Sequence, residues 1–425
     1  MDVLLINAIA YSCVFLYSIF KYRRINIYNS TLLAFTVVAI LGYITTKMGI
    51  QLVDSVNFGE HTSVVPYICL FISVLFIISP LKKLNNLNMS FDEIDCKPFH
   101  KFIYFSMVVY VLVTIVMIYK IYLVMQQGFA EAYLSRRLDG EELVQFDNFF
   151  LNFAVTKGIT YVNATFAIST IYLFNNLLKK KNILWSVIGL LLCFLPNILS
   201  SLSAGSKGML FFNAFDIIFF YLLFESYLPR VIKKTFVLGG FGIAFLLITY
   251  AVNIQNDRNE AANSEKMASE VMMRYLGESM PNLGDLYVDV KQHPYGKRFF
   301  PLFTGGYLAD TAEEYSDYWA KYTHARIDNF KTIWGDAFVE FGFIGSFVFL
   351  FIIVYLYRKY VFSHCNNIYI YPLIYYYYNK VCIYGIFNVC FVDMRSLQVT
   401  LYAILLSIFL YKITKNKAIG QYKLQ

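Results

Sequence analysis

Long runs of apolar residues, separated by short polar connections, follow one another along the whole chain. A helix needs about 20 mostly apolar residues to cross the hydrocarbon core of a bilayer. Runs of this kind predict eleven spans, at residues 3–20, 31–50, 62–79, 102–123, 149–178, 183–201, 208–227, 235–252, 337–357, 368–391 and 397–411. The pattern therefore predicts a polytopic membrane protein.

The composition supports helices as the spanning elements. Hydrophobic residues make up 58% of the 425 residues and charged residues only 15%, whereas soluble domains average about 25% charged. The apolar runs are uninterrupted and lack the alternation of a membrane β-barrel, and a helix satisfies its own backbone hydrogen bonds in lipid. We expect an all-α polytopic fold in which residues 1–425 form a single integral membrane domain.

Basic residues mark every second connection between the predicted spans. Such residues concentrate on the cytoplasmic side, so we expect an outside N-terminus, a cytoplasmic C-terminus and no cleaved signal peptide. The net charge of +8 then reflects topology, and nucleic acid is not an expected partner. The basic residues of these connections are Lys21, Arg23, Arg24, Lys82, Lys83, Lys97, Lys101, Lys179, Lys180, Lys181, Arg230, Lys233, Lys234, Arg358, Lys359, Lys412, Lys415, Lys417 and Lys423.

The connections decide where chemistry is possible. The longest one on the predicted cytoplasmic side, residues 80–101, has no glycine-rich phosphate loop, which argues against a cytoplasmic ATP or nucleotide-sugar site. On the outer side lie residues 124–148 and residues 253–335, the latter forming a large outer lobe between spans eight and nine. All seven cysteines fall in spans or cytoplasmic connections, so we expect no disulfide framework, cysteine zinc site or cofactor.

A short turn at the start of span seven has the chemistry of an anion site. The segment SAGSKG places Lys207 among Gly205, Ser206 and Gly208. Free helix N-terminal amides and one ammonium group suit a phosphate. The alternative is a tight interhelical turn whose lysine faces water.

Three arginines in the predicted outer segments are also either phosphate ligands or ordinary structural charges. Arg136 and Arg137 lie beside acidic residues in SRRLDGEE, which fits either a solvated charge run or a bidentate clamp on phosphoryl oxygens. Arg274 lies in a predicted helix together with Lys266, Glu270 and Glu278 at four-residue intervals. That spacing stabilises a helix by itself, so Arg274 is either a member of this ladder or a phosphate ligand.

Aromatic and polar residues alternate near the end of the outer lobe. The aromatic residues that could bind a sugar in this stretch are Tyr315, Tyr318, Trp319 and Trp334. Aromatic faces beside hydrogen-bonding groups suit sugar rings, and an interfacial aromatic belt explains part of the same pattern. Two predicted spans also contain a lysine, Lys157 and Lys380, each of which faces either a polar cavity or the interface.

These motifs together resemble one enzyme family. The segment GDAFVEFGFIG at 335–345, the SAGSK turn and the RYLGE helix are similar to three stretches of Wzy-type O-antigen and capsule repeat-unit polymerases. The topology and the single dominant outer lobe extend the resemblance over most of the chain. Two positions depart from it: Lys207 stands where an arginine is usual, and Glu340 where an asparagine is usual.

The resemblance implies a GT-C-like glycosyltransferase in the bacterial inner membrane. Such an enzyme transfers a growing glycan from undecaprenyl diphosphate to a lipid-linked repeat unit on the outer face, without a metal, and a chain-length regulator is an implied partner. Cations would stabilise the departing diphosphate, and a carboxylate or histidine would accept the proton of the attacking hydroxyl. The candidates for proton acceptance are His324, Asp336 and Glu340. The candidates for diphosphate binding are Arg136, Arg137, Lys207, Arg258, Arg274, Arg298 and Arg326.

Two other functions fit parts of the sequence. An O-antigen ligase has a similar topology and donor, but that family shows a histidine–asparagine pair where this chain has Gly335 and Asp336. A polysaccharide flippase or transporter would bind sugar without making bonds, but such folds favour short loops and paired halves. The sequence favours a polymerase over both.

Overall fold

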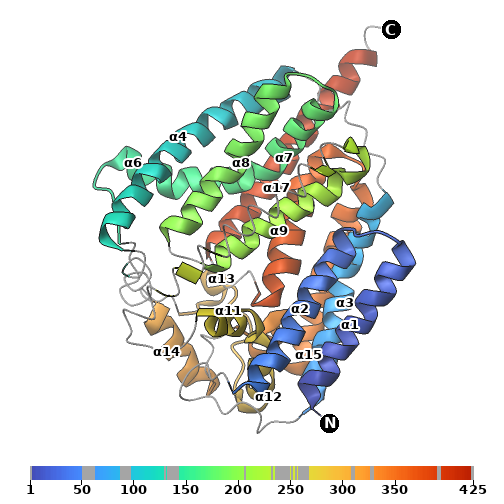
Figure 1. Cartoon of the computed structure of the whole chain (residues 1–425), viewed down its shortest axis with the longest axis vertical. Helices are drawn as coiled ribbons and strands as arrows, with labels where there is room; N and C mark the ends of the chain where they lie inside the picture. Colours follow the sequence, from blue (N-terminus) through green and yellow to red (C-terminus); the bar gives the residue numbers. More distant parts are fainter. Residues whose placement is uncertain are drawn as a thin grey trace.

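The computed structural model describes residues 2–49, 63–86, 97–128, 131, 143–204, 207–230, 233–234, 249, 252–253, 256, 268–307, 312–325, 330–389 and 394–422. The structure is 85% helical, and the described residues contain no strand. The predicted all-α class is therefore confirmed. The elongated helices pack side by side, and the N-terminus and the C-terminus lie at opposite ends of the molecule (Figure 1).

Within the part of the chain that the structure describes, six helical stretches are long and apolar enough to cross a membrane, which supports a multi-pass membrane protein. They are Val3–Tyr22, Ile27–Lys47, Val65–Asn85, Lys97–Gln127, Ile183–Ser203 and Thr332–His364. Spans five, seven, ten and eleven of the sequence prediction are also largely helical where described, and most of span eight (235–252) lies outside the described residues. The total of eleven spans stays a prediction.

The helices form two packed groups. In the first, α1 (Val3–Tyr22) packs on α2 (Ile27–Lys47), and α3 (Val65–Ile78) packs on α15 (Thr332–Leu356). The second group contains α4 (Lys97–Gln127), α6 (Phe149–Phe153), α7 (Ile159–Leu178), α8 (Ile183–Ser203), α9 (Lys207–Phe224), α16 (Tyr371–Tyr376) and α17 (Met394–Tyr422). Both groups share one buried apolar core.

Short polar residues begin several of these helices. Asp2 accepts a hydrogen bond from the amide of Leu4, and Asn26 and Asn29 form a reciprocal capping box at the start of α2. Such side chains satisfy amides that the first helical turn leaves without partners. An ion pair of 3.0 Å between Lys47 and Asp2 joins the end of α2 to the start of α1.

The described part of residues 253–335, which the sequence predicts as an outer lobe and which we call the lobe, contains four short helices. These are α11 (Ala268–Gly277), α12 (Ser279–Asp289), α13 (Pro301–Thr304) and α14 (Ala312–Thr323). The junction of α11 and α12 lies directly against α2, because a Cβ atom on Gly277 would come within 2.6 Å of the backbone nitrogen of Gly42. The hydroxyl of Tyr67 in α3 also donates to the carbonyl of Met280 at 3.1 Å. The lobe is thus fixed to the first helix group.

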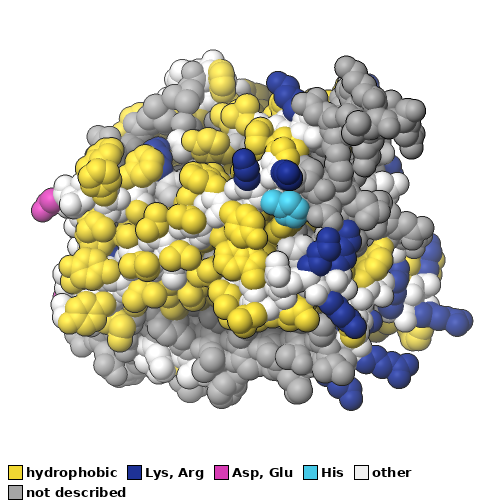
Figure 2. Space-filling view, turned by 90° about the horizontal axis from the view of Figure 1, so that it is seen from above, with side chains coloured by type: hydrophobic (Ala, Val, Ile, Leu, Met, Phe, Trp, Pro, Cys, Tyr) yellow, Lys and Arg dark blue, Asp and Glu magenta, His cyan; other side chains and the backbone are white. Residues whose placement is uncertain are grey.

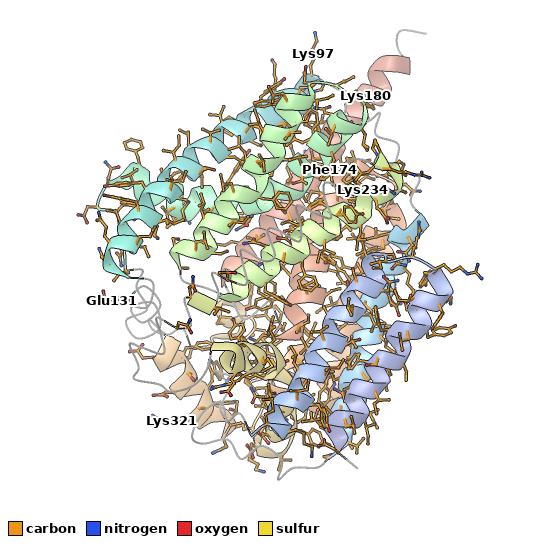
Figure 3. All side chains as sticks on the ribbon, in the orientation of Figure 1. Lys97, Glu131, Phe174, Lys180, Lys234 and Lys321 are labelled. Atoms are coloured by element: carbon orange, nitrogen blue, oxygen red, sulfur yellow. The ribbon has the colours of Figure 1, made fainter. Side chains whose placement is uncertain are left out.

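The two ends of the bundle differ in chemistry, and we name them by this difference. Lys97, Lys180 and Lys234 lie toward the upper right of Figure 3, which we call the basic end. Glu131 and Lys321 lie at the opposite side, near the lobe helices, which we call the lobe end. Large apolar side chains face outward along the bundle, with Phe20 78%, Ile344 76% and Leu184 74% exposed. An outward apolar surface of this kind suits lipid.

The predicted tenth span has an irregular backbone. It consists of a 3₁₀ turn (Ile368–Ile370), α16, a π-helical turn η8 (Tyr377–Ile383) and a second 3₁₀ turn (Tyr384–Ile386). Its first part follows Phe362, whose carbonyl accepts from Lys83 of the basic end. Its last part reaches the lobe end, where the Phe387 carbonyl accepts from the amides of Lys331 and Thr332. The segment therefore crosses the bundle.

Candidate functional site

A polar cavity of about 420 Å³ lies within the second helix group. Its walls come from α4, α7, α8, α9, α16, η8, α17 and the π-helical turn η3 (Ala154–Gly158). Three lysines, Lys120, Lys157 and Lys380, line it together with one carboxylate, Asp216. Amide and hydroxyl side chains supply much of the remaining wall. A cavity of this size can hold a small polar ligand, and its excess of positive charge favours an anion.

Two of the three lysines lie on π-helical turns. Lys157 is on η3, and Lys380 is on η8 next to Asn379. A π-helical turn inserts one extra residue into the helical repeat, and such turns occur frequently at functional sites. Lys157 makes no hydrogen bond or ion pair within the described structure, although it belongs to the cavity wall. Lys157 contributes its positive charge to the cavity wall.

Asp216 is positioned by its neighbours on η8 and α16. The side-chain amide of Asn379 donates to Asp216 Oδ1 at 2.6 Å, and the hydroxyl of Tyr375 donates to the same carboxylate. The positive charge of Lys380 acts on Asp216 electrostatically. Asp216 is only 4% exposed, so its carboxylate is held in a fixed place at the cavity wall.

The cavity lies in the half of the bundle nearer the lobe end. Lys120 follows Lys97 by 23 residues in one continuous helix, which places it about 35 Å from the basic end of α4. Asn197 and Ser203 lie in the last two turns of α8, whose first residue follows the basic Lys179–Lys181 connection. The cavity therefore lies on the side of the molecule that carries the lobe.

An aromatic cluster connects the cavity to the lobe. The ring of Phe212, which lines the cavity, lies 5.8 Å from that of Phe387. The ring of Phe387 in turn lies 4.8 Å from Phe330 and 6.1 Å from Tyr275 of α11. These four rings form a continuous apolar path from the cavity wall to the lobe helix that carries Arg274.

Three of the candidate residues from the sequence meet elsewhere, in a buried ion cluster. Arg298 donates from Nη2 to Asp336 Oδ1 at 2.5 Å and from Nε to Glu340 Oε2 at 3.0 Å. Arg298 is 2% exposed and both carboxylates are 0% exposed. Burial alone would lower the pKa of Arg298, but the charges of Asp336 and Glu340 outweigh this effect and raise it above its ordinary value.

Every carboxylate oxygen of this cluster already has a donor. Asp336 Oδ2 accepts from the Val389 amide at 2.8 Å, and Lys331 lies 3.7 Å from Asp336 Oδ1. Glu340 Oε1 accepts from the amides of Gly296 and Arg298 at 2.6 and 3.2 Å. A proton acceptor has to reach its substrate, and neither carboxylate is accessible. We therefore assign Arg298, Asp336 and Glu340 to the attachment of the lobe to α15, in place of the chemical roles expected from the sequence.

The aromatic candidates divide into buried and exposed residues. Trp319 and Trp334 are both 0% exposed and pack among other rings, so neither has a face open to a sugar. Tyr315 is partly buried beside the ion cluster, where burial raises the pKa of its hydroxyl. Tyr318 is 40% exposed and stacks on Tyr307 at 4.2 Å. Of the four candidates, Tyr318 is the most exposed, and Tyr307 stacks on its ring.

The remaining candidates do not line the cavity or are not described. His324 is exposed at the end of α14, and Arg274 is half-buried in α11, where burial lowers its pKa and Glu278 opposes this shift. Arg136, Arg137, Arg258 and Arg326 lie outside the described residues, as does the side chain of Lys207. The first two residues of the SAGSKG segment, Ser203 and Ala204, do line the cavity.

Lys120 and Asp216 are not among the candidates from the sequence. Both are ionisable residues inside predicted spans, and such residues are rare and usually functional. This signal is present in the sequence, but only the structure shows that these side chains converge. Comparisons with protein-family models, curated proteins and solved structures find no match to this chain.

Proposed function

We propose that the protein is a glycosyltransferase that polymerises oligosaccharide repeat units carried on a polyprenyl diphosphate, of the O-antigen or capsule polymerase kind. The observation that carries this proposal is the cavity that joins Lys120, Lys157 and Lys380 to Asp216 inside a lipid-facing helix bundle. The resemblance of the SAGSKG, RYLGE and GDAFVEFGFIG segments to that family supports the same function. A GT-C-like arrangement with eleven spans belongs to this proposal.

The cations of the cavity suit the leaving group of such a reaction. A lipid diphosphate gains negative charge as the bond to its sugar breaks, and preorganised ammonium groups in a low-dielectric site stabilise that charge strongly. Lys157 and Lys380 come from turns on different helices, so together they can hold the diphosphate from two sides. The polyprenyl tail would remain in lipid against the apolar outer surface.

The carboxylate of the cavity suits the acceptor sugar. The hydroxyl oxygen of the acceptor forms a bond to the anomeric carbon of the donor, while the bond from that carbon to the diphosphate oxygen breaks. The diphosphate takes the electron pair of that bond, and Asp216 takes the hydroxyl proton. Hydrogen bonds from Asn379 and Tyr375 orient the carboxylate for this role.

The proposed function requires one orientation of the protein in the membrane. The basic end faces the cytoplasm of a bacterial cell and the lobe end faces outward, so the reaction takes place at the outer leaflet of the inner membrane. An O-antigen ligase would use the same donor. The carboxylate beside the cations fits sugar transfer by a ligase as well as by a polymerase. The resemblance of the motifs to polymerases is our reason for preferring the polymerase.

The test replaces Asp216 in cells that lack the chromosomal gene. We expect Asp216→Asn to reach the membrane in normal amounts and to leave surface glycan with a single repeat unit. Asp289→Asn, which changes an exposed carboxylate of the lobe, is the matched control and should give a full glycan ladder. A full ladder from Asp216→Asn would remove Asp216 from the reaction.

Deletion of the gene separates the functions: lipid-linked polymer without its final acceptor indicates a ligase, and repeat units trapped on the cytoplasmic face indicate a flippase.

A further inference from the structure

A second group of cations lies at the basic end, outside the cavity wall and unused by the proposed reaction. Lys21 lies in the last turn of α1, Lys82 lies in the 3₁₀ turn η1 (Ser79–Asn86) after α3, and Arg358 lies in the π-helical turn η5 (Tyr357–Val361) after α15. These residues are far apart in the sequence, yet their contacts join them. Lys21 and Lys82 lie over the rings of Tyr22 and Tyr28, which are 6.2 Å apart, and Arg358 donates to Ser79 of η1, so that Lys21 and Arg358 both act electrostatically on Lys82. We call these three residues the basic triad.

The triad has no acidic neighbours on its own segments. Residues 21–28, 79–86 and 357–370 contain neither aspartate nor glutamate. Figure 2 shows Lys and Arg side chains gathered on one side of the face seen from above, and the acidic side chains of the described residues appear there only at the opposite edge. Three cations held together in this way repel one another, and a bound anion removes that cost.

Contacts with the protein fix two members of the triad in place. The ammonium of Lys82 lies 4.7 Å from the ring centroid of Tyr28, and the guanidinium of Arg358 lies 5.3 Å from that of Phe76. Arg358 also donates to the hydroxyl of Ser79. Both side chains remain exposed, so their charges are positioned by aromatic rings and stay accessible from outside.

Large apolar side chains are exposed immediately beside these cations. Phe20 is 78% exposed and Tyr17 64% on α1, and Phe351 is 57% and Tyr355 48% exposed on α15. A free phosphate ion has no use for such a surface. A phospholipid has an anionic headgroup that fits the cations and acyl chains that fit the apolar side chains below them.

We infer that the basic triad is a binding site for the headgroup of an anionic phospholipid. The lipid joins the ends of α1, α3 and α15, three helices of the first group, and thereby stabilises the group to which the lobe is attached. The site is independent of the proposed transferase activity, because none of its residues lines the cavity.

The test measures thermal unfolding of the purified full-length protein in detergent with added phosphatidylglycerol or phosphatidylcholine. We expect phosphatidylglycerol alone to raise the midpoint. The triple variant Lys21→Gln, Lys82→Gln, Arg358→Gln should need at least tenfold more of this lipid for the same shift. The matched control Lys179→Gln, Lys180→Gln, Lys234→Gln removes the same charge elsewhere at the basic end and should keep the full response.

Three outcomes overturn the inference. Equal loss of response in both triple variants would show diffuse electrostatic attraction, and an unchanged response in the triad variant would show that the lipid binds elsewhere. Inorganic phosphate producing the same shift as the lipid would show an ion site. Where the triple variant fails to fold, the single variant Lys82→Gln is measured with the same expected weakening and the same contrary outcomes.

Discussion

At the scale of single residues, the ion cluster of Arg298, Asp336 and Glu340 shows how a charged motif serves structure. The three side chains are almost fully buried and satisfy one another. Burying charges is expensive, and such a group contributes little compared with an apolar packing of equal volume. Removing one partner is different, because it leaves an uncompensated charge in the interior. The cluster therefore makes the lobe and α15 depend on each other.

Arg298→Ala tests this dependence. It leaves the buried Glu340 without a cation and Asp336 with Lys331 alone, so we expect the free energy of unfolding to fall by about 3 to 5 kcal/mol. Thermal unfolding of the purified protein in detergent measures the loss, with Lys321→Ala, an exposed change in the lobe, as control. Full thermal stability combined with loss of glycan polymer would return Arg298 to a role in binding substrate.

At the scale of elements, the kink in α15 explains a glycine of the motif GDAFVEFGFIG. Gly342 has φ 73° and ψ −173° inside an otherwise helical segment, a conformation that is essentially restricted to glycine. A Cβ atom there would also lie 3.2 Å from the ring of His293, whose Nδ1 lies 3.0 Å from the Val339 carbonyl. The kink separates the part of α15 that holds the lobe from the part that crosses the bundle.

Gly342→Ala should therefore destabilise the protein by about 1 to 3 kcal/mol through backbone strain. The thermal midpoint in detergent is again the measurement. Ile344→Ala is the control, since Ile344 lies two residues further along α15, has a helical backbone and is 76% exposed. Equal, small effects of both changes would show that the kink relaxes without cost.

At the scale of the whole molecule, the arrangement separates a basic end from a lobe end. The N-terminus and the C-terminus also lie at opposite ends (Figure 1). Basic connections concentrate on the cytoplasmic side of membrane proteins, and the cavity lies in the half nearer the lobe. The orientation of the protein thus decides on which side of the membrane a ligand enters the cavity.

Cysteine labelling of intact cells tests the orientation. Lys291→Cys places a thiol on the exposed surface of the lobe, and Lys180→Cys places one at the basic end. With a membrane-impermeant maleimide, we expect the first variant to react in intact cells and the second only after permeabilisation. The unaltered chain measures background labelling of its own cysteines. The reverse pattern would place the cavity on the cytoplasmic side and contradict the proposed function.

The sequence by itself determined the class of the fold and the position of most helices. Apolar runs of membrane-spanning length and polar caps such as Asp2 and Asn26 are local features, and a helix forms its hydrogen bonds locally. Lysines inside such runs are also visible in the sequence, which makes Lys157 and Lys380 candidates for a cavity.

The tertiary structure alone decided which charged residues meet. Lys120, Lys157, Asp216 and Lys380 lie on four elements separated by dozens of residues, and nothing local brings them together. In the same way, Asp336 and Glu340 look like accessible acids in the sequence, and only the packing of Arg298 against α15 turns them into a buried cluster. The role of a charged side chain depends on its burial and on the charged or polar groups that it contacts. The packing of the helices determines both.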